Sequence, residues 1–384
     1  MRLRHIHITE TRPFRRAAGR NDLTRPDLAR VRGLARAGLA LALLLASATA
    51  SNAEKLYWSN TSTDTIQRSN LDGSALETVV AGVTSFGIAL DPAAGKLYWT
   101  DLGDPNTLGD ESIRRSNLDG SGIEILLGAI DGVRDPVSIA VDPAAGWMYW
   151  TDAGAGARGV YRADLDGSNR VRLIDVEALG AARAAAGIPG LEFSQVWGLA
   201  LDVPGGSLYW CDYFAGDIHR ADLDGTNIDP PLVSGLVTPR ALALDAAAGR
   251  VLWSQSPFES EIGSVGQDGS LPIVFLGRPA WNVREPFGMA VDPVAGQLYW
   301  TDSKTGEISR IALDGTAPEV VLTLRAFDPR KNRFRAESPF AIAIDTTPPP
   351  PPPPPVRCGL GFEVAFVVPV LVALRRRRLV RSRS

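Results

Sequence analysis

The stretch Leu97-Tyr98-Trp99-Thr100-Asp101 decides the fold, because five related stretches recur along the 384-residue chain. The other copies occupy residues 56–60, 148–152, 208–212, 251–255 and 298–302. Counted between their second residues, successive copies lie 41 to 60 residues apart. A repeat of this length, built from short β-rich segments, is typical of a blade of a β-propeller.

Two further landmarks accompany each copy of the repeat. The first is an Asp-Gly turn between apolar runs, as in Leu118-Asp119-Gly120, which favours a β-hairpin because Gly adopts positive φ without steric cost. The second is an apolar strand with Ala at alternate positions, as in Gly87-Ile88-Ala89-Leu90-Asp91. Its near-continuous apolar character predicts an innermost strand buried on both faces. Each unit therefore supplies four strands joined by tight turns.

The two ends of the repeat region predict how the propeller closes. The region starts with a Tyr-Trp strand at residues 56–60 that has no earlier inner strand. It finishes with an inner strand at 340–345 that has no later Tyr-Trp partner. Pairing these strands completes a blade and removes exposed sheet edges. The sequence therefore predicts an all-β fold, a six-bladed β-propeller with four-stranded blades, closed by pairing of its N- and C-terminal strands.

The segment before the propeller has the layout of a secretory signal. An Ala/Leu-rich run lies at residues 34–50, and Arg30, Arg32 and Arg36 precede its apolar centre at residues 39–45. Small residues come next, so we expect cleavage after Ala53 or Ala50. A short membrane anchor or a buried helix is the alternative for this run. We assign residues 1–53 to an N-terminal extension with a signal peptide and 54–345 to the propeller, and we expect an exported protein.

The segment after the propeller predicts a spacer and an anchor. Residues 346–357 include eight consecutive prolines at 348–355, which favour a stiff polyproline helix. Residues 358–384 contain Cys358, an apolar run at 362–374 and an Arg cluster at 375–378. The run is shorter than the ~20 residues usual for a span, but Arg side chains can snorkel. We expect a transmembrane helix with its Arg-rich tail in the cytoplasm.

Charge and residue usage disfavour several functions. Residues 54–355 hold 23 basic and 39 acidic side chains, and so acidic a domain argues against nucleic-acid binding. His219 is the one His of the repeat region, and Cys211 and Cys358 form no Cys-x-x-Cys pair. Zinc hydrolysis and Ser–His–Asp catalysis are therefore disfavoured, and we expect no catalytic residue, metal site or cofactor. We expect His219 on a strand surface and Cys211 as a partly buried thiol.

The Leu-Tyr-Trp-Thr-Asp repeats and Leu-Asp-Gly turns resemble the YWTD propeller of the low-density lipoprotein receptor family over residues 55–345. The resemblance implies a six-bladed binding or ligand-release module without enzymatic activity, in which Asp101 satisfies backbone donors at a blade junction. It also implies a structural role for the repeat residues Tyr57, Trp58, Tyr98, Trp99, Asp101, Tyr149, Trp150, Asp152, Tyr209, Trp210, Asp212, Trp253, Tyr299, Trp300 and Asp302.

The sequence departs from that family in two ways. The repeats differ at Ser59-Asn60, Cys211, Leu252 and Gln255, so we expect looser blades there. The cysteine-rich modules that flank the animal propellers are missing, so the ligands of those proteins cannot be carried over. The end of the chain resembles tripartite bacterial C-terminal sorting signals, with Cys358-Gly359-Leu360-Gly361 as the motif, which implies that Cys358 is a processing or lipid-anchoring site. A plain C-terminal membrane anchor is the alternative.

Two functions remain open at this point. The first is a non-enzymatic, surface-tethered, monomeric propeller of the cell envelope that presents a binding face to a protein or glycan ligand. The second is a metal-dependent propeller hydrolase or lactonase that uses carboxylates in the central channel, from Asp91, Asp142, Asp202, Asp245, Asp292 and Asp345. Insertions at 102–112 and at 175–193, the latter with a short predicted helix from Glu177, are either binding loops or decoration.

Overall fold

The computed structural model describes residues 54–104, 106–107, 109–185, 195–256, 260–277, 283–328 and 333–346. All of them belong to the unit Asn52–Ser384. The predicted signal peptide with Ala53, the proline run and the C-terminal segment with Cys358 lie outside these residues. Within them, helices long and apolar enough to span a bilayer do not occur.

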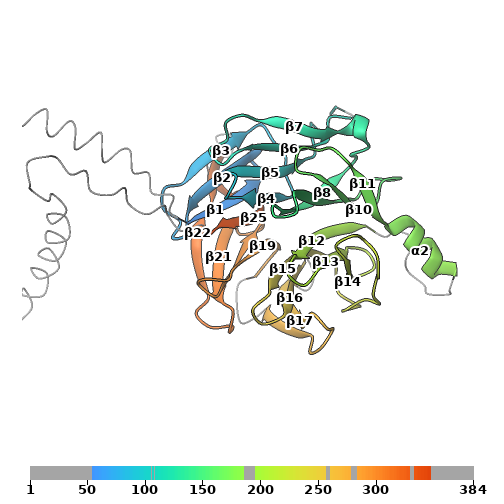
Figure 1. Cartoon of the computed structure of the whole chain (residues 1–384). Helices are drawn as coiled ribbons and strands as arrows, with labels where there is room; N and C mark the ends of the chain where they lie inside the picture. Colours follow the sequence, from blue (N-terminus) through green and yellow to red (C-terminus); the bar gives the residue numbers. More distant parts are fainter. Residues whose placement is uncertain are drawn as a thin grey trace, which may run out of the picture. The chain divides into compact units, whose positions relative to one another are not determined.

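The described residues form six antiparallel sheets arranged as propeller blades, and one further hairpin (Figure 1). The first blade joins both ends of the repeat region. From its inner to its outer strand it contains β25 (Pro339–Asp345), β1 (Lys55–Asn60), β2 (Thr65–Asn70) and β3 (Glu77–Ala81). The second contains β4 (Ile88–Asp91), β5 (Lys96–Asp101), β6 (Ser112–Asn117) and β7 (Glu124–Gly128). The third contains β8 (Pro136–Asp142), β9 (Trp147–Asp152), β10 (Gly159–Asp164) and β11 (Val171–Asp175).

The remaining blades follow the same order. The fourth contains β12 (Val196–Asp202), β13 (Ser207–Asp212) and β14 (Asp217–Asp222). The fifth contains β15 (Pro239–Asp245), β16 (Arg250–Gln255), β17 (Glu261–Gly266) and β18 (Ile273–Gly277). The sixth contains β19 (Pro286–Asp292), β20 (Gln297–Asp302), β21 (Glu307–Ala312) and β22 (Glu319–Thr323). Between blades lie η1 (Ala129–Asp131), α2 (Val176–Ala185) and the hairpin of β23 (Arg325–Asp328) and β24 (Arg333–Ala336).

The fourth blade differs from the prediction of four strands. A segment beside β14 takes the place of the outer strand, and it pairs through an isolated bridge between Ile218 and Val233. Pro230 and Pro231 precede this bridge. Proline has no N–H to donate to a ladder, so a regular fourth strand cannot form there. The predicted helix, in contrast, is confirmed as α2, and the Asp175 carboxylate accepts a hydrogen bond from Ala178 N at 2.9 Å at its start.

The closure predicted from the repeat count is confirmed. Strand β25 runs antiparallel to β1, with Lys55 opposite Asp345 and Trp58 opposite Ile342. Figure 1 shows β25, in red, beside β1, in blue. The inner strand of this blade therefore comes from the far end of the repeat region, which leaves no gap between the first and sixth blades.

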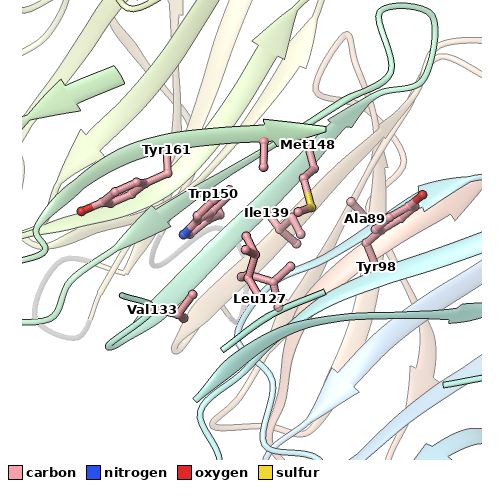
Figure 2. Close-up of a cluster of buried hydrophobic side chains, with 10 residues drawn as sticks. Ala89, Tyr98, Leu127, Val133, Ile139, Met148, Trp150 and Tyr161 are labelled. Carbon is pink, nitrogen blue, oxygen red and sulfur yellow. The ribbon is translucent and has the colours of Figure 1, made fainter. Parts of the chain in front are cut away.

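The Tyr-Trp pair explains how neighbouring blades pack. Adjacent residues of a strand point to opposite faces of its sheet, so the two rings enter different blade junctions. Tyr98 packs with Met148 and Trp150 of the following blade, while Trp99 packs with Tyr57 of the preceding blade. Figure 2 shows Tyr98 on one side of such a junction and Met148 and Trp150 on the other. The Tyr and Trp side chains of all copies are at most 3% exposed.

Four of the six Asp-Gly turns, those with Gly73, Gly120, Gly167 and Gly225, lie closely against the outer strand of the preceding blade. Gly120 has φ of +83°, and a Cβ at this position would lie 1.9 Å from the backbone oxygen of Val79. Glycine is therefore required at this turn both by its backbone conformation and by the close approach of the neighbouring strand.

Antiparallel topology separates two faces of the propeller. The turns from the first to the second strand and from the third to the fourth strand lie on one side, which we call the short-turn face. The remaining connections lie on the opposite side, which we call the long-loop face. The long-loop face carries residues 102–111, η1, α2 and the β23–β24 hairpin. Nearly all the irregular structure of the described residues is thus gathered on one side.

Candidate functional site

The inner strands meet at the long-loop face around a cavity of about 120 Å³. Each strand contributes one side chain at an equivalent position to its lining, and we call these residues the mouth ring. They are Phe86, Val137, Trp197, Arg240, Phe287 and Phe340. Four of these six residues are aromatic and one is cationic, a combination that is uncommon for the end of a buried strand.

The aromatic residues of the mouth ring touch one another across the channel. The ring centroids of Phe287 and Phe340 are 3.9 Å apart, and Phe86 stacks on Phe340 at 4.8 Å. Trp197 lies 6.1 Å from Phe86 and 6.0 Å from Phe287. Trp197 also stacks on Tyr213 at 4.7 Å. Apart from the closer Phe287–Phe340 contact, these separations fall within the range of favourable aromatic pairs, and a connected aromatic cluster narrows the channel.

The Thr residue of the Tyr-Trp-Thr-Asp repeat forms hydrogen bonds with the backbone of the mouth ring. The Thr151 hydroxyl accepts a hydrogen bond from Ser138 N at 3.0 Å and donates to the Trp197 carbonyl of the next blade at 2.7 Å. Thr100 donates in the same way to the Val137 carbonyl at 3.0 Å, and Thr301 donates to that of Phe340. Each hydroxyl therefore links the inner strands of two blades and fixes a mouth-ring residue in place.

Two repeats that depart from the Thr-Asp pattern keep similar contacts with other groups. The Ser254 hydroxyl donates to the Phe287 carbonyl at 3.0 Å, and the buried thiol of Cys211 lies 3.4 Å from the Pro239 carbonyl. Burial raises the pKa of the Cys211 thiol to about 12, so this side chain is an uncharged, weak donor rather than a nucleophile. The fifth blade thus has the weakest of these links, beside the mouth-ring residue Arg240.

The Asp residues of the repeat accept backbone hydrogen bonds at the long-loop face. Asp152 accepts from Arg134 N at 2.9 Å, Asp135 N at 3.1 Å and Gly154 N at 2.9 Å. Asp302 does the same for Arg284 N and Lys304 N. These bonds tie the segment that arrives from the preceding blade to the turn that follows the second strand, as the resemblance implied for Asp101.

Asp101 and Asp212 lie in the same surroundings. Asp101 accepts from Gly103 N at 3.0 Å and pairs with the Arg114 guanidinium at 3.2 Å, and Asp212 accepts from Ala215 N at 3.0 Å. Where the sequence has an amide instead of Asp, the contact persists, since Gln255 Oε1 accepts from Val237 N at 3.2 Å. The side chains of the repeat therefore lie beside the mouth ring without lining its cavity.

Buried carboxylates give the long-loop face a distinct electrostatic character. Burial raises the pKa of Asp135, and the nearby charges of Asp152 and Glu111 raise it further. Burial also raises the pKa of Asp152, although three backbone donors and Arg170 act against that shift. These two carboxyl groups are therefore more easily protonated than a carboxyl group in water.

Arg240 is the charged member of the mouth ring. Its guanidinium carbon lies 4.0 Å from the ring centroid of Phe287, 5.4 Å from that of Trp197 and 5.6 Å from that of Tyr213. Burial lowers the pKa of Arg240, while the charges of Tyr213 and Glu285 act in the opposite direction. Cation–π contacts thus replace part of the water that the guanidinium has lost.

His219 is not on a strand surface, so that prediction was wrong. Its side chain is 3% exposed and stacks on Trp210 with 5.0 Å between ring centroids. Its Nε2 lies 3.8 Å from an Asp217 carboxylate oxygen. The position faces the repeat Trp across the strand pair. Cys211 is fully rather than partly buried.

The aspartates that finish the inner strands lie on the short-turn face, and five of the six, all but Asp345, cap turns. Asp91 accepts from Ala94 N at 3.0 Å, and Asp142 accepts from Ala145 N at 3.1 Å. Asp202, Asp245 and Asp292 make the matching bonds in their own turns. In the part of the chain that the structure describes, no three His, Cys, Asp or Glu side chains gather as a metal site. The carboxylates proposed for a hydrolase therefore have a role in the turns themselves.

The mouth ring was missed from the sequence, except that Trp197 stands outside the repeat. A signal does exist: each member precedes the small residue or Ser that opens an apolar strand, as in Phe86-Gly87 and Phe287-Gly288. Aligned by blade, these positions form a column of Phe, Val, Trp and Arg. Trp281, another residue outside the repeat, lies outside the described residues.

Comparisons with known proteins agree with this architecture. No protein-family model matches the chain. A low-density lipoprotein receptor-related protein 1 of Pyricularia oryzae is 30% identical over 185 residues, which are 44% of this chain and 58% of that protein. The human low-density lipoprotein receptor-related protein 5-like protein is 30% identical over 178 residues, which are 46% of this chain and 62% of that protein.

A chain from the crystal structure of a nidogen/laminin complex superimposes with a TM-score of 0.57 at 22% identity, over 76% of this chain and 98% of that one. The chain is a six-bladed β-propeller whose repeats are similar to parts of these receptor-related proteins. The match covers less than two thirds of the length of either receptor-related relative.

Proposed function

We propose that this YWTD-type propeller is a non-enzymatic binding module that presents its long-loop face to a protein ligand outside the cytoplasm. The observation that carries the proposal is the mouth ring, an aromatic cluster with one cation at the centre of the face that holds the irregular loops. Binding sites concentrate on loops that a rigid scaffold positions. Aromatic residues and Arg are also the side chains that dominate protein interfaces.

The surface around the mouth ring favours a protein over a glycan. Phe214 is 61% exposed and packs edge-on against Tyr213 at 5.1 Å, which extends the aromatic cluster outward from Trp197. Ile130 of η1, on the same face, is 97% exposed. A large exposed aromatic side chain beside an aromatic cluster, as at Phe214, fits the apolar core of a protein interface. The names of the two relatives, which are receptor-related proteins, support the same class of ligand.

The repeat residues have a structural part in this proposal. Their Tyr and Trp rings fill the blade junctions and their Thr hydroxyls fix the mouth ring, so they shape the site without touching a ligand. We further propose that the protein acts as a monomer, that residues 1–53 direct export, and that the segment with Cys358 tethers it to the cell envelope. The chain enters and leaves the propeller on the short-turn face, which directs the mouth ring away from a tether.

A photo-cross-linker placed at Phe214 or at Val294 tests the choice of face. Val294 is 79% exposed on the short-turn face and serves as the matched control. We expect one envelope or extracellular protein to be captured from position 214 and not from position 294. We also expect Phe214→Glu to lower the affinity for that protein by about tenfold or more, and Val294→Glu to leave it unchanged. Equal capture from both positions would contradict the proposal.

A further inference from the structure

The mouth ring contains two hydrogen-bond donors that lack an acceptor. Arg240 Nε and Trp197 Nε1 are both buried, and neither has a hydrogen-bond partner among the described residues. Both side chains line the same cavity, and the guanidinium carbon lies 5.4 Å from the indole centroid. Most buried donors in folded proteins find an acceptor, so two neighbouring exceptions call for an explanation.

The charge of Arg240 is also uncompensated by an ion pair. Within the described residues, no carboxylate lies at salt-bridge distance from its guanidinium, in contrast to Arg68, Arg115 and Arg250. The groups whose charge acts on it are Tyr213 and Glu285. Its contacts are instead with the faces of Phe287, Trp197 and Tyr213, which leave the N–H groups at the guanidinium edge unused.

Equivalent positions in the other blades sharpen this contrast. The five other mouth-ring residues are apolar or aromatic, so closing the channel does not require a cation. An apolar residue would fill the position of Arg240 without the cost of removing a charge from water. The cation at this one position is therefore better explained by a negatively charged group that arrives from outside.

We propose that the mouth ring binds a carboxylate of the ligand, with the Arg240 guanidinium as its ionic partner and the Trp197 indole N–H as a second donor. This inference rests on the proposed function and names the chemistry that the face recognises. A planar guanidinium suits a carboxylate, because two N–H groups can donate to its two oxygens. The cavity of about 120 Å³ admits one side chain or chain end rather than a drug-sized molecule, for which sites are about 300 Å³ or larger.

The carboxylate has two sources in a protein, an Asp or Glu side chain and the chain terminus. The peptides Ac-Phe-Asp-NH₂ and Ac-Phe-Ala-OH represent these sources, and their uncharged controls are Ac-Phe-Asn-NH₂ and Ac-Phe-Ala-NH₂. The full chain is titrated with each peptide up to about 10 mM by ligand-observed NMR, because a single subsite gives millimolar affinity. We expect at least one carboxylate peptide to bind about tenfold more tightly than its control. The preferred peptide then identifies the source.

Three variants distinguish the ionic contact from nonspecific binding to the aromatic cluster. Arg240→Gln should abolish the preference for the carboxylate peptide, whereas Arg134→Gln, which alters an exposed Arg of the same face, should leave it intact. Trp197→Phe keeps an aromatic ring but removes the N–H, and should reduce the preference by a few-fold. Thermal unfolding of each variant shows whether the fold is retained.

The wild-type protein alone can overturn the inference. Equal binding of charged and uncharged peptides, or no binding of any of them at about 10 mM, would mean that the two donors are satisfied by water only. A preference that survives Arg240→Gln would equally exclude the assignment. If a partner captured at Phe214 binds the Arg240→Gln variant as tightly as the wild type, the proposed function stands and the carboxylate site does not.

Discussion

The short-turn face and the long-loop face are built by the same strands, yet they differ in how closely the blades resemble one another. On the short-turn face every blade has an Asp-Gly turn, and five of the six have an Asp-capped turn. The neighbouring blade leaves little free space around several of the Asp-Gly turns. On the long-loop face the connections differ in length, and the mouth ring changes from Phe to Val, Trp and Arg. The difference teaches that the repeats share the residues that hold the blades together and differ on the face where we propose that a ligand binds.

The largest effect is expected where the short-turn face is most tightly packed. Gly120→Ala should lower the free energy of unfolding by about 3 kcal/mol or more, because the new Cβ meets the Val79 carbonyl of the preceding blade. Gly315→Ala is the matched control, since this glycine has the same φ of +83° but open space around it. Gly315→Ala should lower the free energy of unfolding by about 1–2 kcal/mol, which is the cost of a positive φ alone. Urea denaturation measures both, and equal losses would contradict the close approach of blades at the turn.

A smaller effect is expected at the hydroxyls that support the mouth ring. Thr151→Val removes the acceptor of Ser138 N and the donor to the Trp197 carbonyl, so it should lower the free energy of unfolding by about 1–3 kcal/mol. Thr305→Val is the control, because the Thr305 hydroxyl is buried but has no partner among the described residues. Thr305→Val should not lower the free energy of unfolding, because no hydrogen bond is lost. A Thr151→Val variant as stable as the control would contradict the view that this hydroxyl stabilises the mouth ring.

The smallest effect concerns pH, and its sign should differ between the faces. The pKa of Asp135, on the long-loop face, is raised by burial and by Asp152 and Glu111. Its protonated form is thus favoured by folding, and the stability that this gives is lost as pH rises through the raised folded pKa. Asp135→Asn should therefore stabilise the protein at pH 7, and this gain should shrink as pH falls toward about 4.

Asp119, in an Asp-Gly turn of the short-turn face, provides the opposite case. Hydrogen bonds from Ser121 lower its pKa, so its contribution to stability is present above the ordinary Asp pKa and is lost as pH falls. Asp119→Asn should therefore destabilise the protein slightly at pH 7 and have no effect at low pH. Thermal unfolding of both variants between pH 3 and 8 gives the two slopes, and slopes of equal sign would show that the two faces do not differ in this respect.

The fold was predictable because the same sequence pattern recurs in each blade. Closure of the propeller was predictable because the strands at residues 56–60 and 340–345 lack partners within their own repeats. The helix α2 was also predictable from its local composition. His219 was misplaced because the position opposite the repeat Trp holds Gln67, Ser309 and other polar residues, which suggests exposure. The His219 side chain is instead buried and stacked on Trp210. The mouth ring depends on six distant strands meeting at one axis, which no local pattern of a single blade expresses.

The pairing of β1 with β25 also determines how the propeller responds to mechanical force. Lys55 and Asp345 lie opposite each other at the same end of this strand pair, so a pull on the two ends of the domain acts at one point. In this unzipping geometry the force breaks the hydrogen bonds between the two strands one after another, instead of acting on all of them at once. The closing blade should therefore open at low tension, whereas a pull across β1 from its opposite end would shear the whole ladder.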